Sequence, residues 1–122
     1  MPGKPISERK RGLPMPLTRS FRETVKEQMD RSPAFRRELL REAVSTMLSG
    51  DLDAGKSVLR DFINGSIRFP ALAESMQRSP KSLMRMFSPS GNPQAKNLFE
   101  VVAILQQAEG LRLEVRATRT AA

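Results

Sequence analysis

Helix start and stop signals divide this chain into short segments, and each segment repeats its apolar residues at helical spacing. Ser32-Pro33 and Ser79-Pro80 each place a capping serine directly before a proline, a pair typical of a helix N-terminus. Between such signals the apolar residues recur every three or four positions, so one face of each helix would be buried. The pattern predicts an all-α fold.

Each predicted element has its own boundary signals. Ser20 and Glu23 have the spacing of a capping box, and Gly50 and Gly110 each follow a helical run that they would end. The predicted helices begin near Ser20, Pro33, Asp51 or Asp53, Pro70, Pro80 and Ala95. After them, Leu111–Val115 alternates apolar and charged residues, which predicts one short C-terminal strand. That strand would need a partner strand, and a second subunit could supply it.

Charge and composition suggest four regions in a chain of single-domain size. Residues 1–16 are rich in proline and basic, which indicates a flexible arm. Residues 17–65 form a nearly neutral N-terminal helical region, residues 66–116 a basic helical region, and residues 117–122 a disordered tail. The net charge of +8 lies almost entirely in the arm and the second half. Such an excess favours an anionic polymer or surface as partner.

The residue inventory excludes most chemistry. The chain has no Cys and no His, so it lacks a disulfide framework, most nucleophile–base pairs and nearly all zinc sites. We therefore expect no enzyme, no cofactor and no metal. No apolar run approaches the roughly 18 residues of a membrane span, and no signal peptide is visible. A cytoplasmic location is expected.

One motif matches a nucleotide-binding pattern by letters alone. Gly50–Ser57 reads GDLDAGKS and fits the phosphate-loop spacing G-x-x-x-x-G-K-[ST]. A true phosphate loop follows a strand, whereas the residues before Gly50 have a helical period, and Asp51 and Asp53 would repel phosphate. We interpret the segment as a helix end followed by a helix cap, with Lys56 an ordinary surface base.

The segment from Leu72 to Phe87 has the spacing of a helix-turn-helix. Two short helices that cross closely need a small residue at the crossing, which Ala73 supplies. The predicted apolar anchors are Leu72, Met76, Leu83 and Met86. Gln77 occupies the turn position usually held by Gly, so its backbone would be strained. Ser79 would cap the second helix, and Ser82 would lie with Lys81 and Arg85 on the face away from the anchors.

A family resemblance rests on the residues around and after this segment. SLMRMFSPSGNP at 82–93, Lys96-Asn97-Leu98 and GLRLEV at 110–115 resemble phage-repressor-like helix-turn-helix regulators, in the branch of prophage-type addiction-module antidotes. The resemblance implies a repressor-like DNA-binding bundle of five helices, usually dimeric, here with extra N-terminal helices. Residues 66–116 would be its helix-turn-helix DNA-binding domain. It places Ser79, Pro80, Lys81, Ser82 and Arg85 on the helix that reads DNA. Lys96 and Asn97 would meet phosphate.

The sequence therefore predicts a regulator that binds double-stranded DNA sequence-specifically and represses transcription as a homodimer on a palindromic operator. An alternative is an antidote that neutralises a small ribonuclease toxin by direct binding and regulates its own operon; the two functions can coexist. Residues 17–65 would then contact the toxin, or else serve as scaffold. RNA binding has little support, because no aromatic platform for stacking bases is visible.

Overall fold

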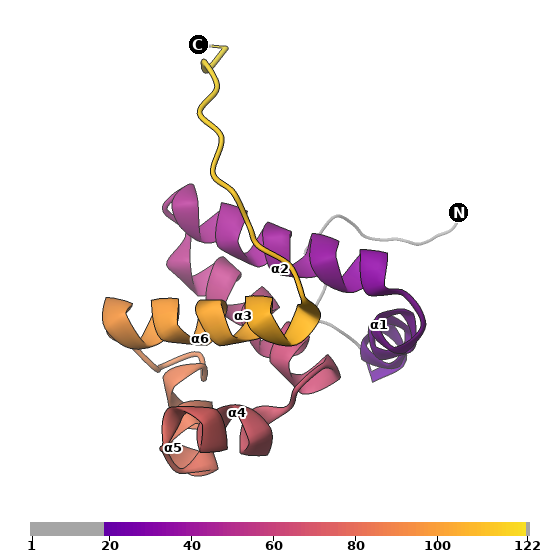
Figure 1. The fold of residues 1–122 in the computed structure, drawn as a ribbon, viewed down its shortest axis with the longest axis vertical. Helices are drawn as coiled ribbons and strands as arrows, with labels where there is room; N and C mark the ends of the chain where they lie inside the picture. The colour runs from indigo at the N-terminus through magenta and orange to yellow at the C-terminus, as the bar shows by residue number, and fades with distance from the viewer. Residues whose placement is uncertain (1–18, 122) are drawn as a thin grey trace, which may run out of the picture.

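The computed structural model describes residues 19–121, with side chains from residue 23, and shows an all-helical bundle (Figure 1). The helices are α1 (Arg19–Arg31), α2 (Pro33–Leu48), α3 (Leu52–Gly65), α4 (Phe69–Met76), α5 (Pro80–Met86) and α6 (Ala95–Glu109). The all-α prediction is confirmed for this part of the chain. The predicted basic arm, residues 1–16, lies outside the described residues. In the described range, no helix is long and apolar enough to cross a bilayer.

The helix ends lie where the local signals predicted them. The Ser32 hydroxyl accepts a hydrogen bond from the Phe35 N–H (3.1 Å), and the Asp51 carboxylate accepts one from the Ala54 N–H (3.1 Å). Gly50, at φ +101°, turns the chain between α2 and α3. The described part of the first helix starts at Arg19, next to the predicted start near Ser20. The predicted capping box there involves a side chain outside the described ones.

A single apolar core joins the two halves of the chain. Its fully buried members include Leu40 of α2, Phe62 of α3, Leu72 of α4, Leu83 of α5 and Leu105 of α6. The boundary expected near residues 65 and 66 is the turn between α3 and α4, and the core continues across it. Residues 17–65 and 66–116 therefore share one hydrophobic core in the described range, and the inner faces of α2 and α3 help to build it.

Gly55 lets α2 and α3 approach each other closely. The α3 backbone at Gly55 is buried against α2, and a Cβ there would collide with the Met47 side chain and the Ala43 carbonyl oxygen. Because only glycine lacks that atom, the close packing of this helix pair depends on Gly55. In Figure 1 the pair lies above α4 and α5, which form the opposite end of the bundle.

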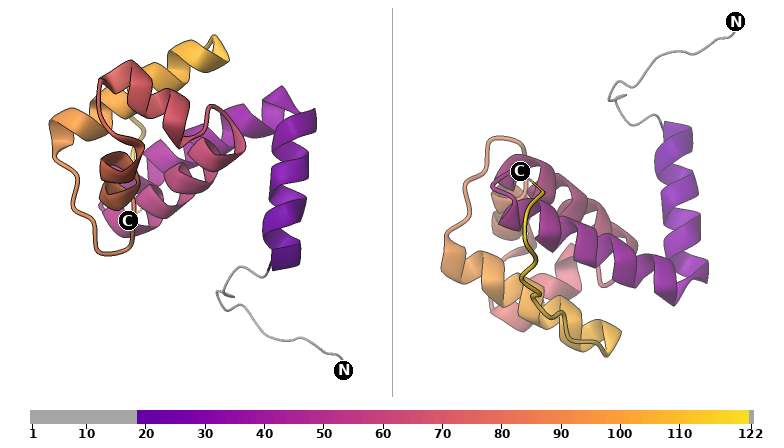
Figure 2. Two further views of the ribbon diagram at one scale, coloured as in Figure 1. Left: turned by 90° about the horizontal axis from the view of Figure 1, so that it is seen from below. Right: turned by 90° about the horizontal axis from the view of Figure 1, so that it is seen from above.

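The first helix, α1, stands at one side of the bundle (Figure 2) and is attached near its C-terminal end. Its Met29 side chain is buried in the core. Arg36 of α2 donates to the Met29 carbonyl oxygen and forms an ion pair with Glu109 of α6, with 2.9 Å between Nε and Oε1. One arginine thus ties together α1, α2 and α6.

The predicted strand at Leu111–Val115 does not form in the described chain. Residues 111–121 have no regular secondary structure, and the segment leaves α6 at Gly110 (φ +66°) and runs out past α2 (Figure 1). Leu111 and Leu113 pack against the core, and the Leu113 N–H donates to the Gln106 side chain (2.6 Å). The prediction was wrong for the single chain because no neighbouring strand is present to complete a ladder.

Candidate nucleic-acid interface

The α4 and α5 helices pack together through the residues that the spacing singled out. Ala73, the small residue expected at the crossing, is fully buried, and so are Leu72 and Leu83. Of the other two predicted anchors, Met76 is buried and Met86 is half-buried. Phe87, directly after α5, packs its ring against Phe69 at the start of α4, with 6.1 Å between ring centroids. Buried residues therefore anchor α4 and α5 to the core, from Phe69 at the start of α4 to Phe87 just after α5.

The turn between the two helices is held by backbone hydrogen bonds. Gln77 adopts the left-handed conformation (φ 56°, ψ 45°), as the sequence predicted for this turn position. Its N–H donates to the Glu74 carbonyl, and the Arg78 N–H donates to the Ala73 carbonyl (3.0 Å). This is the pattern of a Schellman helix end, which satisfies carbonyls that the helix leaves free. The angle between α4 and α5 is thereby set within the turn itself.

One face of α5 is left open to solvent. Ser79 caps the helix by accepting a hydrogen bond from the Ser82 N–H (3.1 Å). Lys81 and Arg85, four residues apart, are both exposed and lie on one stripe, and Met84 between them is 53% exposed. The predicted reading residues Ser79, Pro80, Lys81 and Arg85 are all exposed, and Ser82 is half-buried.

The charged residues from 75 to 99 are all basic. Residues 75–99 contain the four bases Arg78, Lys81, Arg85 and Lys96 and no acid. Lys81, Arg85 and Lys96 form no ion pair with any described residue. No carboxylate among the described residues contacts these three side chains, although Glu74 and Glu100 flank the segment, and the arrangement can attract a polyanion.

Comparisons with protein-family models, curated proteins and solved structures found no match.

The two predicted phosphate contacts at the start of α6 fall in different environments. Lys96 is exposed, as its expected role requires. Asn97 is only 8% exposed, and its carboxamide oxygen accepts a hydrogen bond from Nη2 of Arg78 (2.8 Å). A direct phosphate contact would use the carboxamide N–H groups of Asn97, and the burial of this residue leaves little surface for such a contact.

A buried lysine fixes the loop that follows α5. Lys56 of α3 is 3% exposed, and its ammonium group donates to the Gly91 carbonyl (2.6 Å). The expectation that Lys56 is an ordinary surface base was therefore wrong. Gly91 itself tolerates no Cβ, which would collide with the Arg85 and Met86 carbonyl oxygens. The loop from Ser88 to Gln94 is thus held tightly against the end of α5.

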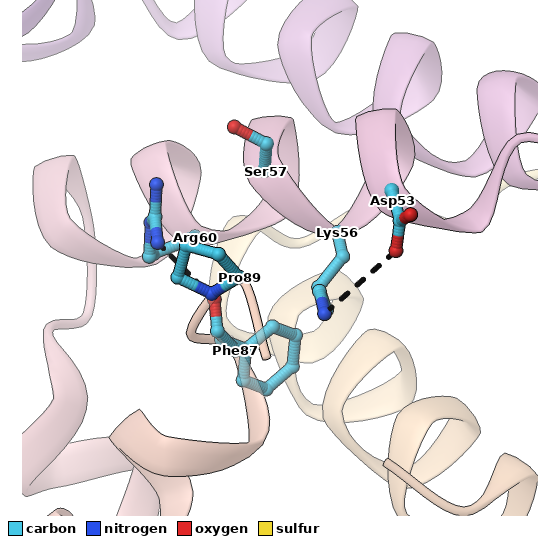
Figure 3. Close-up of a pocket in the computed structure, with 6 residues that line it drawn as sticks. All are labelled: Asp53, Lys56, Ser57, Arg60, Phe87 and Pro89. Atoms are coloured by element: carbon cyan, nitrogen blue, oxygen red, sulfur yellow. Dashed lines mark hydrogen bonds and ion pairs between the residues drawn. The ribbon is translucent and has the colours of Figure 1, made fainter. Parts of the chain in front are cut away.

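A shallow hollow of about 250 Å³ lies between α3 and this loop (Figure 3). Its charged groups already have partners within the protein, while the Ser57 hydroxyl has none among the described residues. Lys56 also lies 4.0 Å from the Asp53 carboxylate, and Nη1 of Arg60 donates to the Phe87 carbonyl (3.3 Å). We interpret the hollow as part of the support for α5. Among the described residues, no group of acidic side chains could hold a metal ion.

The phosphate-loop look-alike is a helix junction, as the sequence analysis interpreted it. Gly50 and Asp51 connect α2 to α3, and the remaining residues of the motif belong to the first turns of α3. No strand precedes the motif, because α2 does. The backbone N–H of Ala54 is already bonded to Asp51 rather than free to cradle a phosphate.

Sequence reasoning missed the roles of two residues in this region. Arg78 was given no role among the predicted DNA contacts, and Lys56 was assigned to the surface although it is buried. A charged residue at a turn position where small residues are common was a usable signal for Arg78. No local sequence signal indicated that Lys56 is buried, since its partner Gly91 lies 35 residues away in the chain.

Replacing Gln77 by Gly should stabilise the protein. A residue with a side chain is strained in the left-handed region, and glycine is not, although glycine gains more freedom on unfolding. The net gain should be about 0.5–1 kcal/mol, or roughly 2–5 °C in melting temperature. Thermal melts measure it. The matched control is Ser75→Gly, an exposed position in the last turn of α4, which should be destabilising. An equal decrease in melting temperature in both variants would contradict the claim that the Gln77 backbone is strained.

Proposed function

We propose that this protein binds double-stranded DNA by placing α5 in the major groove, and that it represses transcription from an operator occupied as a dimer. The observation that supports this most strongly is the construction of α5. Its inner side is locked into the core by Leu83, while Lys81 and Arg85 are exposed and unpaired among the described residues. A helix that reads DNA needs one face packed against the protein core and an opposite face that is exposed and basic.

The division of contacts follows from the positions of these residues. Arg85 can form a bidentate pair with the guanine edge, which gives sequence preference. Lys81 and Lys96 lie in the first turns of α5 and α6 and can neutralise phosphates, which positions the protein on any sequence. Ser79, Pro80 and Ser82 form the N-terminal end that approaches the bases. In this proposal α4 and α5 act as a helix-turn-helix with α5 as the recognition helix. The same role is expected from the resemblance to phage-repressor-like regulators.

Selection from a random library of DNA duplexes tests the proposal. The enriched sequences should share a short half-site, repeated as a palindrome, because a helix of seven residues can read only a few base pairs. Affinity for the selected duplex should fall linearly with the logarithm of salt concentration. Enrichment of single strands or RNA, or no enrichment at all, would contradict the proposal.

A dimer is the expected binding form. Phe99 on α6 is 67% exposed and is flanked at four-residue spacing by the exposed Ala95 and Ala103, so α6 presents an apolar stripe. We propose that a second copy of this chain covers the stripe, with the unpaired segment Leu111–Val115 near the contact. Half-sites should then be spaced by about one DNA turn, roughly 34 Å, or a multiple of it.

Sedimentation of the free protein at micromolar concentration tests this prediction by measuring its mass in solution. The parent chain should sediment at twice the 13.7 kDa of one chain, and Phe99→Glu should shift it to the monomer without unfolding it. Phe99→Glu should also bind the full palindrome more weakly, since the two half-sites are no longer linked. A parent chain that stays monomeric on its palindrome would contradict the dimer.

The antidote function stays a prediction. The inner faces of α2 and α3 are used in the shared core, which supports a scaffold role for them. Leu48 and Leu52 remain exposed at the junction between α2 and α3.

A further inference from the structure

Arg78 is the one basic residue of the 75–99 segment whose side chain is held in place by the protein. Its Nη2 donates to the Asn97 oxygen at 2.8 Å, and its backbone N–H is bonded to the Ala73 carbonyl. Asn97 is more than nine-tenths buried in the first turn of α6. Both ends of Arg78 are therefore fixed, although the residue as a whole is exposed.

The partner of Arg78 leaves its charge intact. Arg36, Arg41 and Arg112 each pair with a carboxylate, which compensates the guanidinium charge. Asn97 supplies a neutral oxygen, so the positive charge of Arg78 remains uncompensated. A guanidinium has five N–H donors, and the bond to Asn97 uses one of them. The remaining donors form a planar, positively charged group whose orientation is set in advance.

The position of this group specifies its ligand. Arg78 directly precedes Ser79, the cap of α5, so it lies at the entrance of the helix proposed to enter the groove. Residues that flank a reading helix meet the sugar–phosphate backbone and position the protein on the duplex. Planar guanidinium groups bind phosphate through two parallel hydrogen bonds.

We infer that Arg78 is a preorganised clamp for a DNA backbone phosphate, and that buried Asn97 is the positioning residue that holds it. This inference rests on the proposed DNA binding of α5. It gives Asn97 an indirect role in place of the direct phosphate contact expected from the sequence. It also predicts that the clamp acts equally on every DNA sequence, because a phosphate carries no base identity.

Two substitutions separate this role from a purely structural one. Arg78→Ala should weaken binding to operator and to scrambled duplex alike, by about tenfold, and should reduce the salt slope by about one for each bound subunit. Asn97→Asp keeps the shape of the side chain but puts a carboxylate against the guanidinium. It should retain the fold while weakening both duplexes by a similar factor, because the charge is now compensated. A purely structural hydrogen bond predicts an unchanged salt slope for Asn97→Asp, because no phosphate contact is lost.

The matched control is Arg37→Ala, which removes an exposed cation from α2, at the far end of the bundle from α5 (Figure 1). It should leave affinity and salt slope nearly unchanged. All variants are compared by titration of the full chain at several salt concentrations, with thermal melts. If the parent chain binds DNA but both Arg78→Ala and Asn97→Asp bind as it does, the clamp is wrong and α5 can still read DNA. If the parent chain binds no duplex, the proposed function and the clamp both fail.

Discussion

Leu83→Ala should lower the free energy of unfolding by about 2–5 kcal/mol. Leu83 is fully buried beneath α5, so removing its side chain leaves a cavity in the core that the neighbouring helices cannot close completely. The neighbouring residue provides the control. Met84→Ala removes a side chain that is 53% exposed and should change stability little.

Denaturant titration of the two variants measures this contrast, and DNA titration below the melting temperature completes it. Leu83→Ala should lose DNA binding only in proportion to the fraction of unfolded protein. Equal stability of the two variants would mean that α5 is rotated relative to the orientation described above, and the assignment of its open face would fail with it.

Local signals predicted most of the helix boundaries because capping is decided within three or four residues. Ser32, Asp51 and Ser79 each bond to an N–H three positions further along, and Gly50 and Gly110 adopt positive φ at helix ends. The exposed stripe of Lys81 and Arg85 follows from the same helical period that buries Leu83. These features depend on sequence neighbours alone, so the sequence is sufficient to locate them.

Features that depend on distant residues were not predictable in the same way. Lys56 is buried because Gly91, 35 residues later, offers it a carbonyl. Asn97 is buried, and its partner Arg78 lies 19 residues earlier in the chain. The alternation at Leu111–Val115 is real, but alternation cannot show whether a neighbouring strand exists. Arg68, at φ 74° before α4, carried no local signal for its strained backbone.

Substituting the exposed bases of α5 should reduce DNA binding without lowering stability, whereas substituting the buried Leu83 should lower stability. Arg85→Ala should cost about 1–3 kcal/mol on the operator and relax the preference at one base position, because a bidentate pair with guanine is lost. Lys81→Ala should weaken operator and scrambled duplex alike and reduce the salt slope by about one for each bound subunit, since it removes a phosphate contact. Both side chains are exposed, so neither variant should lower the melting temperature appreciably.

The most direct test of the central claim is a titration of the parent chain, Arg85→Ala and Lys81→Ala on the selected operator and on a scrambled duplex, at several salt concentrations. If α5 reads DNA, Arg85→Ala loses discrimination between the two duplexes while Lys81→Ala keeps it and loses affinity for both. The claim is contradicted if both variants melt normally and bind both duplexes as tightly as the parent chain does.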